Sequence, residues 1–470
     1  MNRTTKIHFI YTNINGFHAD VYSFGLASIV SMARSQGYSA KISIVRNREE
    51  YAKVVAEVKA FSPNVVGFST VSSQYQFVKE LAAEIRAVLP NTLIVCGGVH
   101  PTIAPQCVLD SSVIDTVFMG ESEDAFVEFL DKIESGKDWH EVSNLAYGIQ
   151  GKLVKNALKP QVEDLDRFPQ PDREIYPFGD TIKEVGFATF IFSRGCPFSC
   201  TYCSNHAIAR CYGNKTNKPR YRSPEASICE IEDTCAKFPI DKIFISDDLF
   251  GLDKMWRQEF CEQYRKRIKI RFMCFLRANV LDDEFAKMLK DAGCYRISMG
   301  VESGNDYIRN KVMNRQMPRE MLLRAFRAAQ KVGLETNAIN IIGVPGETEE
   351  MLLDTIQLNR ELWPTSSGAN IFYPYKGTIL GDYCFEKGLV DENLYHGFLL
   401  ERRDTVLKYP AEYKEKLRYY RDHWQDLIYA GDLFKKVAIM VKTSIAWQQA
   451  GKIKRKIKAA LKIGHRSIVR

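Results

Sequence analysis

Two long regions of this chain alternate short apolar runs with amphipathic stretches of helical length. In the first region, residues 6–135, five apolar runs are separated by segments such as QYQFVKELAAEIRAVLP. Parallel strands need a long crossover, usually a helix, whereas antiparallel strands need only a tight turn. The alternation therefore predicts a doubly wound α/β domain with a parallel sheet, which we assign to residues 1–139. The five predicted strands are KIHFIYT, AKISIV, VVGFST, LIVCGGV and TVFMGES.

The second alternating region has longer units and extends from about residue 188 to residue 377. Its six strand-and-helix repeats predict a partial (β/α)6 barrel, which we assign to residues 188–385. The intervening residues 140–187 contain the hairpin signal LAYGIQGKLV and several prolines, so we expect a linker with little helix. Residues 386–470 are predicted to form a helical C-terminal region.

The composition agrees with a globular enzyme of more than one domain. A length of 470 residues exceeds what one core usually serves, and 45% of the residues are apolar. No apolar run approaches the roughly 18 residues of a spanning helix, and the start MNRTTKIHFIYTN lacks the apolar core of a secretory signal. We therefore expect a cytoplasmic enzyme. Most of the 12 cysteines have irregular spacings, which indicates buried free thiols rather than disulfides.

The net charge of +8 comes from the end of the chain. Residues 433–470 hold eleven Lys and Arg and no Asp or Glu, so the rest of the chain carries a net charge of −3. Without a basic main body, a nucleic-acid substrate is not expected. The tail KIKRKIKAALKIGHRSIVR spaces apolar residues like an amphipathic helix. It predicts a helix that docks on its own protein or, as the alternative, a weak contact with an anionic membrane surface.

Three cysteines form a cluster in the stretch RGCPFSCTYC, residues 194–203, at the end of the first predicted barrel strand. Ligands gather at this end of the strands in a parallel barrel. A zinc site would need a fourth ligand, for which Cys211 and His206 lie close enough in sequence. A four-iron four-sulfur cluster held by three thiolates instead leaves one iron open to a small ligand. The three cysteines are Cys196, Cys200 and Cys203.

The spacing Cys-x3-Cys-x2-Cys, with Tyr202 before the last cysteine, resembles the radical S-adenosylmethionine (SAM) superfamily. The resemblance implies that the three cysteines hold a 4Fe-4S cluster and that SAM chelates the open iron. It implies an electron donor of the flavodoxin or ferredoxin type, whose electron cleaves SAM into methionine and a 5′-deoxyadenosyl radical. Tyr202 would lie against the adenine.

The ends of the later barrel strands supply further residues that this resemblance implies for SAM binding. Asp247 and Asp248 would meet the methionine amino group, although Asp248 also suits a helix cap. Arg315 would pair with the methionine carboxylate, because a guanidinium fork matches its shape, although it also suits a surface cation. The turn GVPGET resembles the glycine-rich segment near adenine. The remaining implied residues are Arg277, Glu302, Ser303, Gly343 and Gly346.

The N-terminal domain resembles the flavodoxin-like cobalamin-binding domain that precedes the barrel in one branch of this superfamily. The resemblance lies in CGGVHPTIAPQ, residues 96–106, and MGESEDAFVEFL, residues 119–130. Glycines after a strand let the backbone pass close to a flat macrocycle. A flavodoxin-like domain with an unrelated ligand is the alternative. The implied cobalamin-binding residues are Tyr22, Gly25, Ser69, Thr70, Gly97, Gly98, His100, Gly120 and Glu121.

One departure from the cobalamin pattern concerns the metal. Proteins that bind cobalt through a histidine carry Asp-x-His-x-x-Gly before the first helix, and this chain has DVYSFG with Tyr22 in the histidine position. His18 is nearby but out of register. A neutral phenol is a poor cobalt ligand compared with imidazole, so we expect no histidine on the lower face of cobalamin.

Together the two resemblances predict a cobalamin-dependent radical SAM enzyme that acts on a small molecule. We expect a methyltransferase that transfers a methyl group from methylcobalamin to an unactivated carbon or to a phosphinate phosphorus. A sulfonium cannot methylate a carbon without a lone pair, whereas a substrate radical can take a methyl group from cobalt. A cobalamin-assisted cyclisation or rearrangement without methyl transfer is the alternative within enzymes, and a cobalamin-binding regulator is the non-enzymatic alternative.

Overall fold

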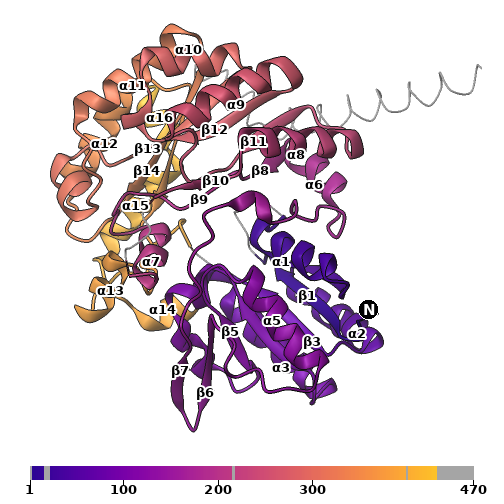
Figure 1. Ribbon diagram of the computed structural model, residues 1–470. Helices are drawn as coiled ribbons and strands as arrows, with labels where there is room; N and C mark the ends of the chain where they lie inside the picture. The colour runs from indigo at the N-terminus through magenta and orange to yellow at the C-terminus, as the bar shows by residue number, and fades with distance from the viewer. Residues whose placement is uncertain (1–2, 15–21, 214–217, 398–400, 431–470) are drawn as a thin grey trace, which may run out of the picture.

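The computed structural model contains an N-terminal sheet domain, a partial barrel and a helical C-terminal segment (Figure 1). The structure describes residues 3–14, 22–213, 218–397 and 401–430. His18 and the basic tail, residues 433–470, lie outside the described residues, as do the predictions made for them. In the described part of the chain, no helix is both long and apolar enough to cross a bilayer.

The N-terminal sheet has seven strands in the order β2-β1-β3-β4-β5-β6-β7. The first five are parallel, and their order 2-1-3-4-5 is that of a flavodoxin-like doubly wound sheet, which confirms the predicted fold. The predicted hairpin is present as β6 and β7, which extend this sheet in antiparallel fashion. The strands are β1 (Lys6–Thr12), β2 (Ser39–Val45), β3 (Val65–Ser69), β4 (Leu93–Gly97), β5 (Thr116–Phe118), β6 (Leu145–Ile149) and β7 (Lys152–Lys155).

Helices cover both faces of this sheet, because neighbouring strand residues point to opposite sides. Val65 packs in the core that contains α1 and α5, whereas Val66 packs in the core that contains α2 and α3. The first of these cores continues without a break into the barrel through Phe178 and Phe190, so the two domains share one apolar interior. The helices are α1 (Phe24–Ser35), α2 (Tyr51–Phe61), α3 (Tyr75–Val88), α4 (Val99–Ile103) and α5 (Glu123–Glu134).

The second sheet has six parallel strands in the order β15-β14-β13-β12-β11-β8, which confirms the predicted partial barrel. Its strands are β8 (Ala188–Phe190), β11 (Lys242–Ile245), β12 (Arg271–Leu276), β13 (Cys294–Glu302), β14 (Glu335–Ile342) and β15 (Ser366–Ile371). The helices between them are α7 (Ser204–Cys211), α8 (Pro224–Lys237), α9 (Lys254–Arg267), α10 (Asp283–Asp291), α11 (Arg319–Lys331) and α12 (Glu349–Leu362).

The segment between the two sheets contains more structure than the sequence predicts. We expected little helix in residues 140–187, yet α6 (Phe178–Val185) forms immediately before β8. Phe178 and Ile182 lie on the buried side of this helix and join the apolar interior shared by the two domains. Burial of an apolar helix face therefore outweighs the weak local signal from the prolines and polar residues around it.

The C-terminal helices pack on the barrel rather than standing apart from it. The side chain of Trp424 is buried, and its Nε1 atom donates a hydrogen bond of 2.8 Å to the Oγ atom of Ser367 on β15. Ser367 in turn donates to Asn359 on α12 at 2.9 Å. The last two helices, α15 (Ala411–Asp422) and α16 (Trp424–Ile428), therefore cover the edge strand of the open barrel. The first two are α13 (Ile379–Glu386) and α14 (Glu392–Gly397).

We predict that Trp424→Phe lowers the stability of the barrel by about 1 kcal/mol, because it removes one buried hydrogen bond and keeps most of the apolar contact. Thermal unfolding followed by circular dichroism measures the loss. In the Ser367→Ala background the same substitution should cost less, since that hydrogen bond is already absent. An equal cost in both backgrounds would contradict the assigned contact.

Candidate functional site

The loop with the three cysteines is held in place by hydrogen bonds from two other parts of the barrel. The backbone N–H of Thr201 donates a hydrogen bond to the carbonyl oxygen of Met313 at 3.1 Å. The Thr201 hydroxyl donates a second one to the carbonyl oxygen of Val312 at 2.7 Å. The N–H of Leu380, at the start of α13, donates to the carbonyl oxygen of Thr201 at 2.9 Å. The segments that follow β13 and β15 thus fix the middle of the loop.

The thiols of this loop lie close enough to affect one another. Burial raises the pKa of Cys203 to about 12, with smaller contributions from Cys200 and Cys196. Burial is also the main reason why the pKa of Cys196 is raised. Thiols in such a site need a metal to become thiolates. Three neighbouring cysteine sulfurs, each able to bind a different iron atom, suit a 4Fe-4S cluster.

The zinc alternative finds no support in the geometry. The described residues contain no group of three or more His, Cys, Asp or Glu side chains arranged around one metal-ion position. Cys211 lies at the far end of α7, and its Sγ atom contacts the carbonyl oxygens of Thr102 and Ala207, both at 3.4 Å. A closed tetrahedral site needs four convergent ligands, which this arrangement does not provide.

A cavity of about 400 Å³ lies between the N-terminal domain and the barrel. Its wall contains residues from the carboxyl ends of the N-terminal strands and also Cys196 and Asp248 from the barrel. The ends of the two parallel sheets therefore face the same space. The N-terminal residues that the sequence analysis named and that line this cavity are Gly25, Ser69, Gly97, Gly98, Gly120 and Glu121.

Glycine suits three positions of the cavity wall for different physical reasons. A Cβ atom on Gly25 would project into open space, so this position leaves room for a ligand. Gly98 has a φ of +106°, and a Cβ atom there would lie 2.5 Å from the carbonyl oxygen of Thr70. At Gly120 a Cβ atom would collide with the hydroxyl of Tyr212, which accepts a hydrogen bond of 2.8 Å from the N–H of Glu121. Gly98 and Gly120 therefore permit close packing.

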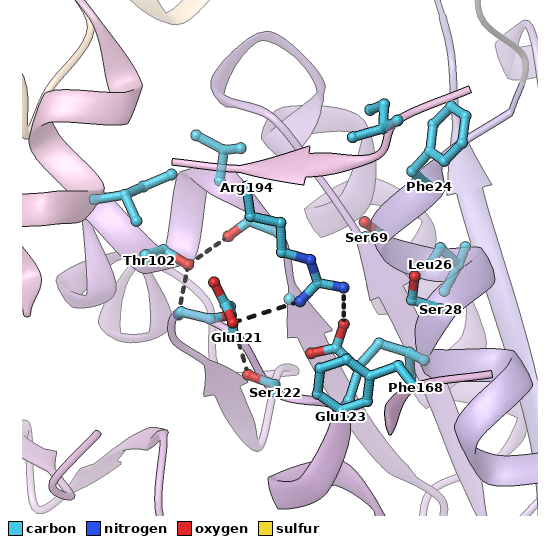
Figure 2. A pocket seen from close by; sticks show the side chains of 18 of the residues that line it. Phe24, Leu26, Ser28, Ser69, Thr102, Glu121, Ser122, Glu123, Phe168 and Arg194 are labelled. Carbon is cyan, nitrogen blue, oxygen red and sulfur yellow. Dashed lines mark hydrogen bonds and ion pairs between the residues drawn. The ribbon is translucent and has the colours of Figure 1, made fainter. Parts of the chain in front are cut away.

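An ion-pair network crosses the cavity wall between the two domains (Figure 2). Arg194 lies two residues before Cys196, and its Nη2 atom is 2.6 Å from the Oε1 atom of Glu123. Its Nη1 atom is 3.5 Å from Glu121, whose carboxylate also receives two hydrogen bonds from Arg220. The side chain of Arg220 is 3% exposed and that of Glu123 is 5% exposed, whereas that of Arg194 is 27% exposed. Two cations and two anions thus neutralise one another at the interface.

Three residues predicted to bind cobalamin do not line the cavity. Tyr22 is buried and packs edge-on against Phe24, Tyr176 and Phe178, at ring-centroid distances of 4.8 to 5.0 Å. Its hydroxyl has no hydrogen-bond partner among the described residues. Thr70 lies behind Gly98, and its N–H donates to the carbonyl oxygen of Gly97. These residues support the wall instead of forming it.

The third of these residues, His100, faces away from the cavity. Its Nδ1 atom lies 3.0 Å from the hydroxyl of Ser72, and its ring packs on Tyr75. Burial lowers the pKa of His100 to about 4, so the imidazole is neutral at physiological pH. The Nε2 atom is buried and has no hydrogen-bond partner in the described part of the chain.

The two aspartates after β11 have different surroundings. Asp247 is fully buried, and its Oδ1 atom accepts hydrogen bonds from the backbone N–H groups of Phe192 and Ser193, at 2.7 and 3.1 Å. Burial raises its pKa to about 7. Asp248 is exposed and faces the cavity, where the Asn205 amide donates a hydrogen bond to its carboxyl group. Asp247 therefore anchors the segment before the cysteine loop, and Asp248 is available to a ligand.

Tyr202 of the cysteine loop forms a hydrogen-bonded set with the buried residues Arg315 and Glu302. The Nη1 atom of Arg315 is 3.0 Å from the Tyr202 hydroxyl and 3.3 Å from a Glu302 carboxylate oxygen. Glu302 has a φ of +66°, at a register shift between β13 and β14. This left-handed conformation is unusual for a residue with a side chain, and the surrounding contacts hold the carboxyl group beside the guanidinium.

Other predicted SAM-binding residues lie in supporting positions. Ser303 is fully buried, and its hydroxyl accepts a hydrogen bond from the N–H of Asn305 at 3.2 Å. Gly343 and Gly346 have φ values of +74° and +82°, as the predicted turn requires. Glu347 closes this turn by accepting the N–H of Gly343 at 2.5 Å, and burial raises its pKa to about 7. Arg277 lies beside Cys200 rather than on the cavity wall.

Several residues of the site were not predicted from the sequence. Four of them, Phe24, Glu123, Arg194 and Glu347, lie inside the stretches quoted above, where the sequence analysis assigned them no role. The other three lie in a linker, a helix and a short strand that no motif marks. Their role depends on contacts between residues far apart in sequence, such as Arg194 and Glu123. The unpredicted members are Phe24, Glu123, Phe168, Arg194, Asn205, Arg220 and Glu347.

Comparison with known proteins identifies both domains. The model of the radical SAM superfamily matches residues 190–358, and the model of the B12 binding domain matches residues 12–130. A protein of Pyrococcus horikoshii named as an uncharacterized methyltransferase is 28% identical over 370 residues, which is 78% of this chain and 79% of that protein. The anaerobic magnesium-protoporphyrin IX monomethyl ester cyclase of Rubrivivax gelatinosus is 25% identical over 393 residues, 79% of this chain and 68% of the cyclase.

A solved structure shows the same fold. The radical SAM methyltransferase TsrM from Kitasatospora setae, with cobalamin and a 4Fe-4S cluster bound, matches with a TM-score of 0.68 and 17% identity. The match covers 82% of this chain and 78% of that one. This likeness shows the fold, and the two family-model matches show that the chain is a radical SAM enzyme. With its N-terminal B12-binding domain it belongs to the cobalamin-binding enzymes of that superfamily, whose cofactors are a 4Fe-4S cluster, SAM and cobalamin.

We predict that changing Cys196, Cys200 and Cys203 together to Ala abolishes the cluster and all formation of 5′-deoxyadenosine, because the iron atoms lose their thiolates. Iron and sulfide analysis after anaerobic reconstitution measures cluster loading. Cys229→Ala, on the outside of α8, is the matched control and should keep the iron content of the unmodified enzyme. Retained iron in the triple variant would contradict the assignment.

We predict that Arg194→Gln weakens cobalamin binding about tenfold, which corresponds to 1.4 kcal/mol, because Glu123 loses its charged partner and the cavity wall loosens. Spectroscopic titration with cobalamin measures the affinity. Glu184→Gln is the control, since its pair with Arg46 joins α6 to the N-terminal domain at an exposed position. An equal loss in both variants would mean that Arg194 has only a general effect on domain contact.

We predict that Tyr22→Phe leaves cobalamin binding unchanged and thermal stability equal or higher, because it removes a buried hydroxyl without a described partner. The electron paramagnetic resonance (EPR) spectrum of bound cob(II)alamin should show no splitting from an axial nitrogen in either protein. Nitrogen splitting would mean that a histidine or the cofactor's own base binds the cobalt.

Proposed function

We propose that this enzyme transfers a methyl group from methylcobalamin to an unactivated carbon, or to a phosphinate phosphorus, of a small-molecule substrate. The observation that carries this proposal is the shared cavity, whose wall contains both the glycines of the B12-binding domain and Cys196 of the cluster loop. Methyl donor and radical source would then act on one substrate. The methyltransferase names of the Pyrococcus horikoshii relative and of TsrM support the same reaction class.

When bound, the cofactors would supply a methyl donor and a radical able to remove a substrate hydrogen atom. The chain's own residues would bind these cofactors and orient them. We assign Cys196, Cys200 and Cys203 to the cluster, and Gly25, Ser69 and Gly97 to the cobalamin surface. The aromatic side chains of Phe24 and Phe168 line the cavity and would keep water from a reactive radical.

On the SAM side, we assign Asp248 and Asn205 to the methionine amino group, because they face the cavity beside the cluster loop. We assign the set of Tyr202, Arg315 and Glu302 to the surface on which adenosine and the methionine carboxylate rest. The buried guanidinium of Arg315 would keep the charge of that surface balanced when a carboxylate arrives. An electron donor of the flavodoxin or ferredoxin type completes the proposal.

A cobalamin-assisted cyclisation is the second candidate, and the Rubrivivax gelatinosus cyclase is the observation that favours it. Both reactions begin with hydrogen abstraction in the same cavity, and they differ in what the substrate radical meets next. The regulator alternative is not retained, since the chain is a radical SAM enzyme.

We predict that SAM with a trideuterated methyl group labels a small-molecule product. Reconstituted enzyme, cobalamin and a reductant are incubated with a metabolite extract, and mass spectrometry searches for compounds heavier by CD3 in place of hydrogen. The triple cysteine variant and enzyme without cobalamin are the controls, and neither should give the labelled compound. A product that forms with 5′-deoxyadenosine but carries no deuterium would replace the methyltransferase with the cyclase or rearrangement reaction.

A further inference from the structure

Arg277 has three contacts, two with the cysteine loop and one with the segment after β13. It follows β12, and the residue is 7% exposed. Its Nη1 atom lies 3.9 Å from the Sγ atom of Cys200, within the longer range of hydrogen bonds to sulfur. Its guanidinium carbon lies 3.5 Å from the ring centroid of Phe198, and its Nη2 atom donates to the carbonyl oxygen of Arg315. The side chain thus joins two residues of the loop to the segment after β13.

These contacts leave Arg277 little capacity for a ligand in the cavity. Both terminal nitrogens already have partners, one face is stacked on an aromatic ring, and only Nε has no partner among the described residues. Arg277 is also absent from the residues that line the cavity. Its charge is therefore directed at the sulfur of Cys200.

The burial of the contact supports this direction. The side chains of Arg277 and Cys200 are both buried, and they lie within the range of a hydrogen bond to sulfur. Because the site is buried, such an interaction is screened less than at the surface.

We propose that Arg277 donates a hydrogen bond to the sulfur of Cys200 and thereby sets the reduction potential of the 4Fe-4S cluster. The proposal rests on the cluster assigned above. Reduction adds one electron, supplied by the external donor, and its negative charge is shared with the sulfur ligands. A cationic donor beside a ligand sulfur stabilises the reduced form more than the oxidised form, which raises the potential. Arg277 is thus a positioning residue that makes the cluster easier to reduce.

Three substitutions separate the charge from the hydrogen bond. Arg277→Met removes both, Arg277→Gln keeps an N–H donor without the charge, and Arg277→Lys keeps the charge without the planar fork. The potential of each reconstituted protein is measured by redox titration of the EPR signal of the reduced cluster, without SAM. In Arg277→Met the ratio of reduced to oxidised cluster at a fixed potential should fall about tenfold, which corresponds to a shift of 59 mV to more negative values.

Arg277→Gln and Arg277→Lys should each show a smaller shift than Arg277→Met, because each retains one of the two contributions. Arg210→Met is the matched control. It removes an exposed arginine from α7, which follows Cys203, and should leave the potential unchanged. An unchanged potential in Arg277→Met, or equal shifts in all three Arg277 variants, would overturn the proposal. The second result would indicate a general loosening of the loop.

Cluster loading separates this proposal from the proposed function. If Arg277→Met does not hold the cluster, the potentials of Arg277→Gln and Arg277→Lys test the proposal instead. An unchanged potential in both variants would overturn it. If the unmodified enzyme holds no cluster, the radical SAM assignment fails and the proposal on Arg277 fails with it. If the enzyme holds the cluster but no methyl transfer is found, the role of Arg277 in the potential is unaffected.

Discussion

The central constraint on this structure is that the cysteine loop needs support from other segments. The loop between β9 (Ser193–Arg194) and α7 has no regular hydrogen-bond ladder of its own. Its backbone is held by the segments after β13 and β15, and the segment that precedes it is held by Asp247 through the N–H groups of Phe192 and Ser193. Because buried backbone groups need partners, these contacts specify where the sulfur atoms lie.

The same loop is connected to the B12-binding domain by the network of Arg194, Arg220, Glu121 and Glu123. Burial of a charge is costly without a partner, so each member of this network requires the others. The shared apolar interior acts in the same direction, since it leaves no separate surface on which the domains could slide freely. The cavity between the domains therefore has a defined shape, as a reaction between two cofactors requires.

The sequence predicted most, but not all, of the residues from the N-terminal domain that it named for the cavity wall. Six of the nine predicted cobalamin residues line the cavity, and five of these lie at the carboxyl ends of β3, β4 and β5, which must meet at the same edge of the sheet. Tyr22 and His100 do not, since side-chain direction at the start of a helix depends on neighbouring aromatic residues such as Tyr176 and Tyr75. The helix α6 was missed because its stability comes from burial of Phe178 and Ile182, which local patterns do not record.

The sequence by itself determined the two parallel sheets and the presence of a cysteine site at the end of a barrel strand. These features are local or periodic: the alternation of apolar runs and helices, and the spacing of Cys196, Cys200 and Cys203. Only the tertiary structure decided which charges meet across the domains and that Arg277 lies beside Cys200 instead of in the cavity. The physical reason is distance along the chain, because Arg277 and Cys200 are 77 positions apart, and only folding brings them together.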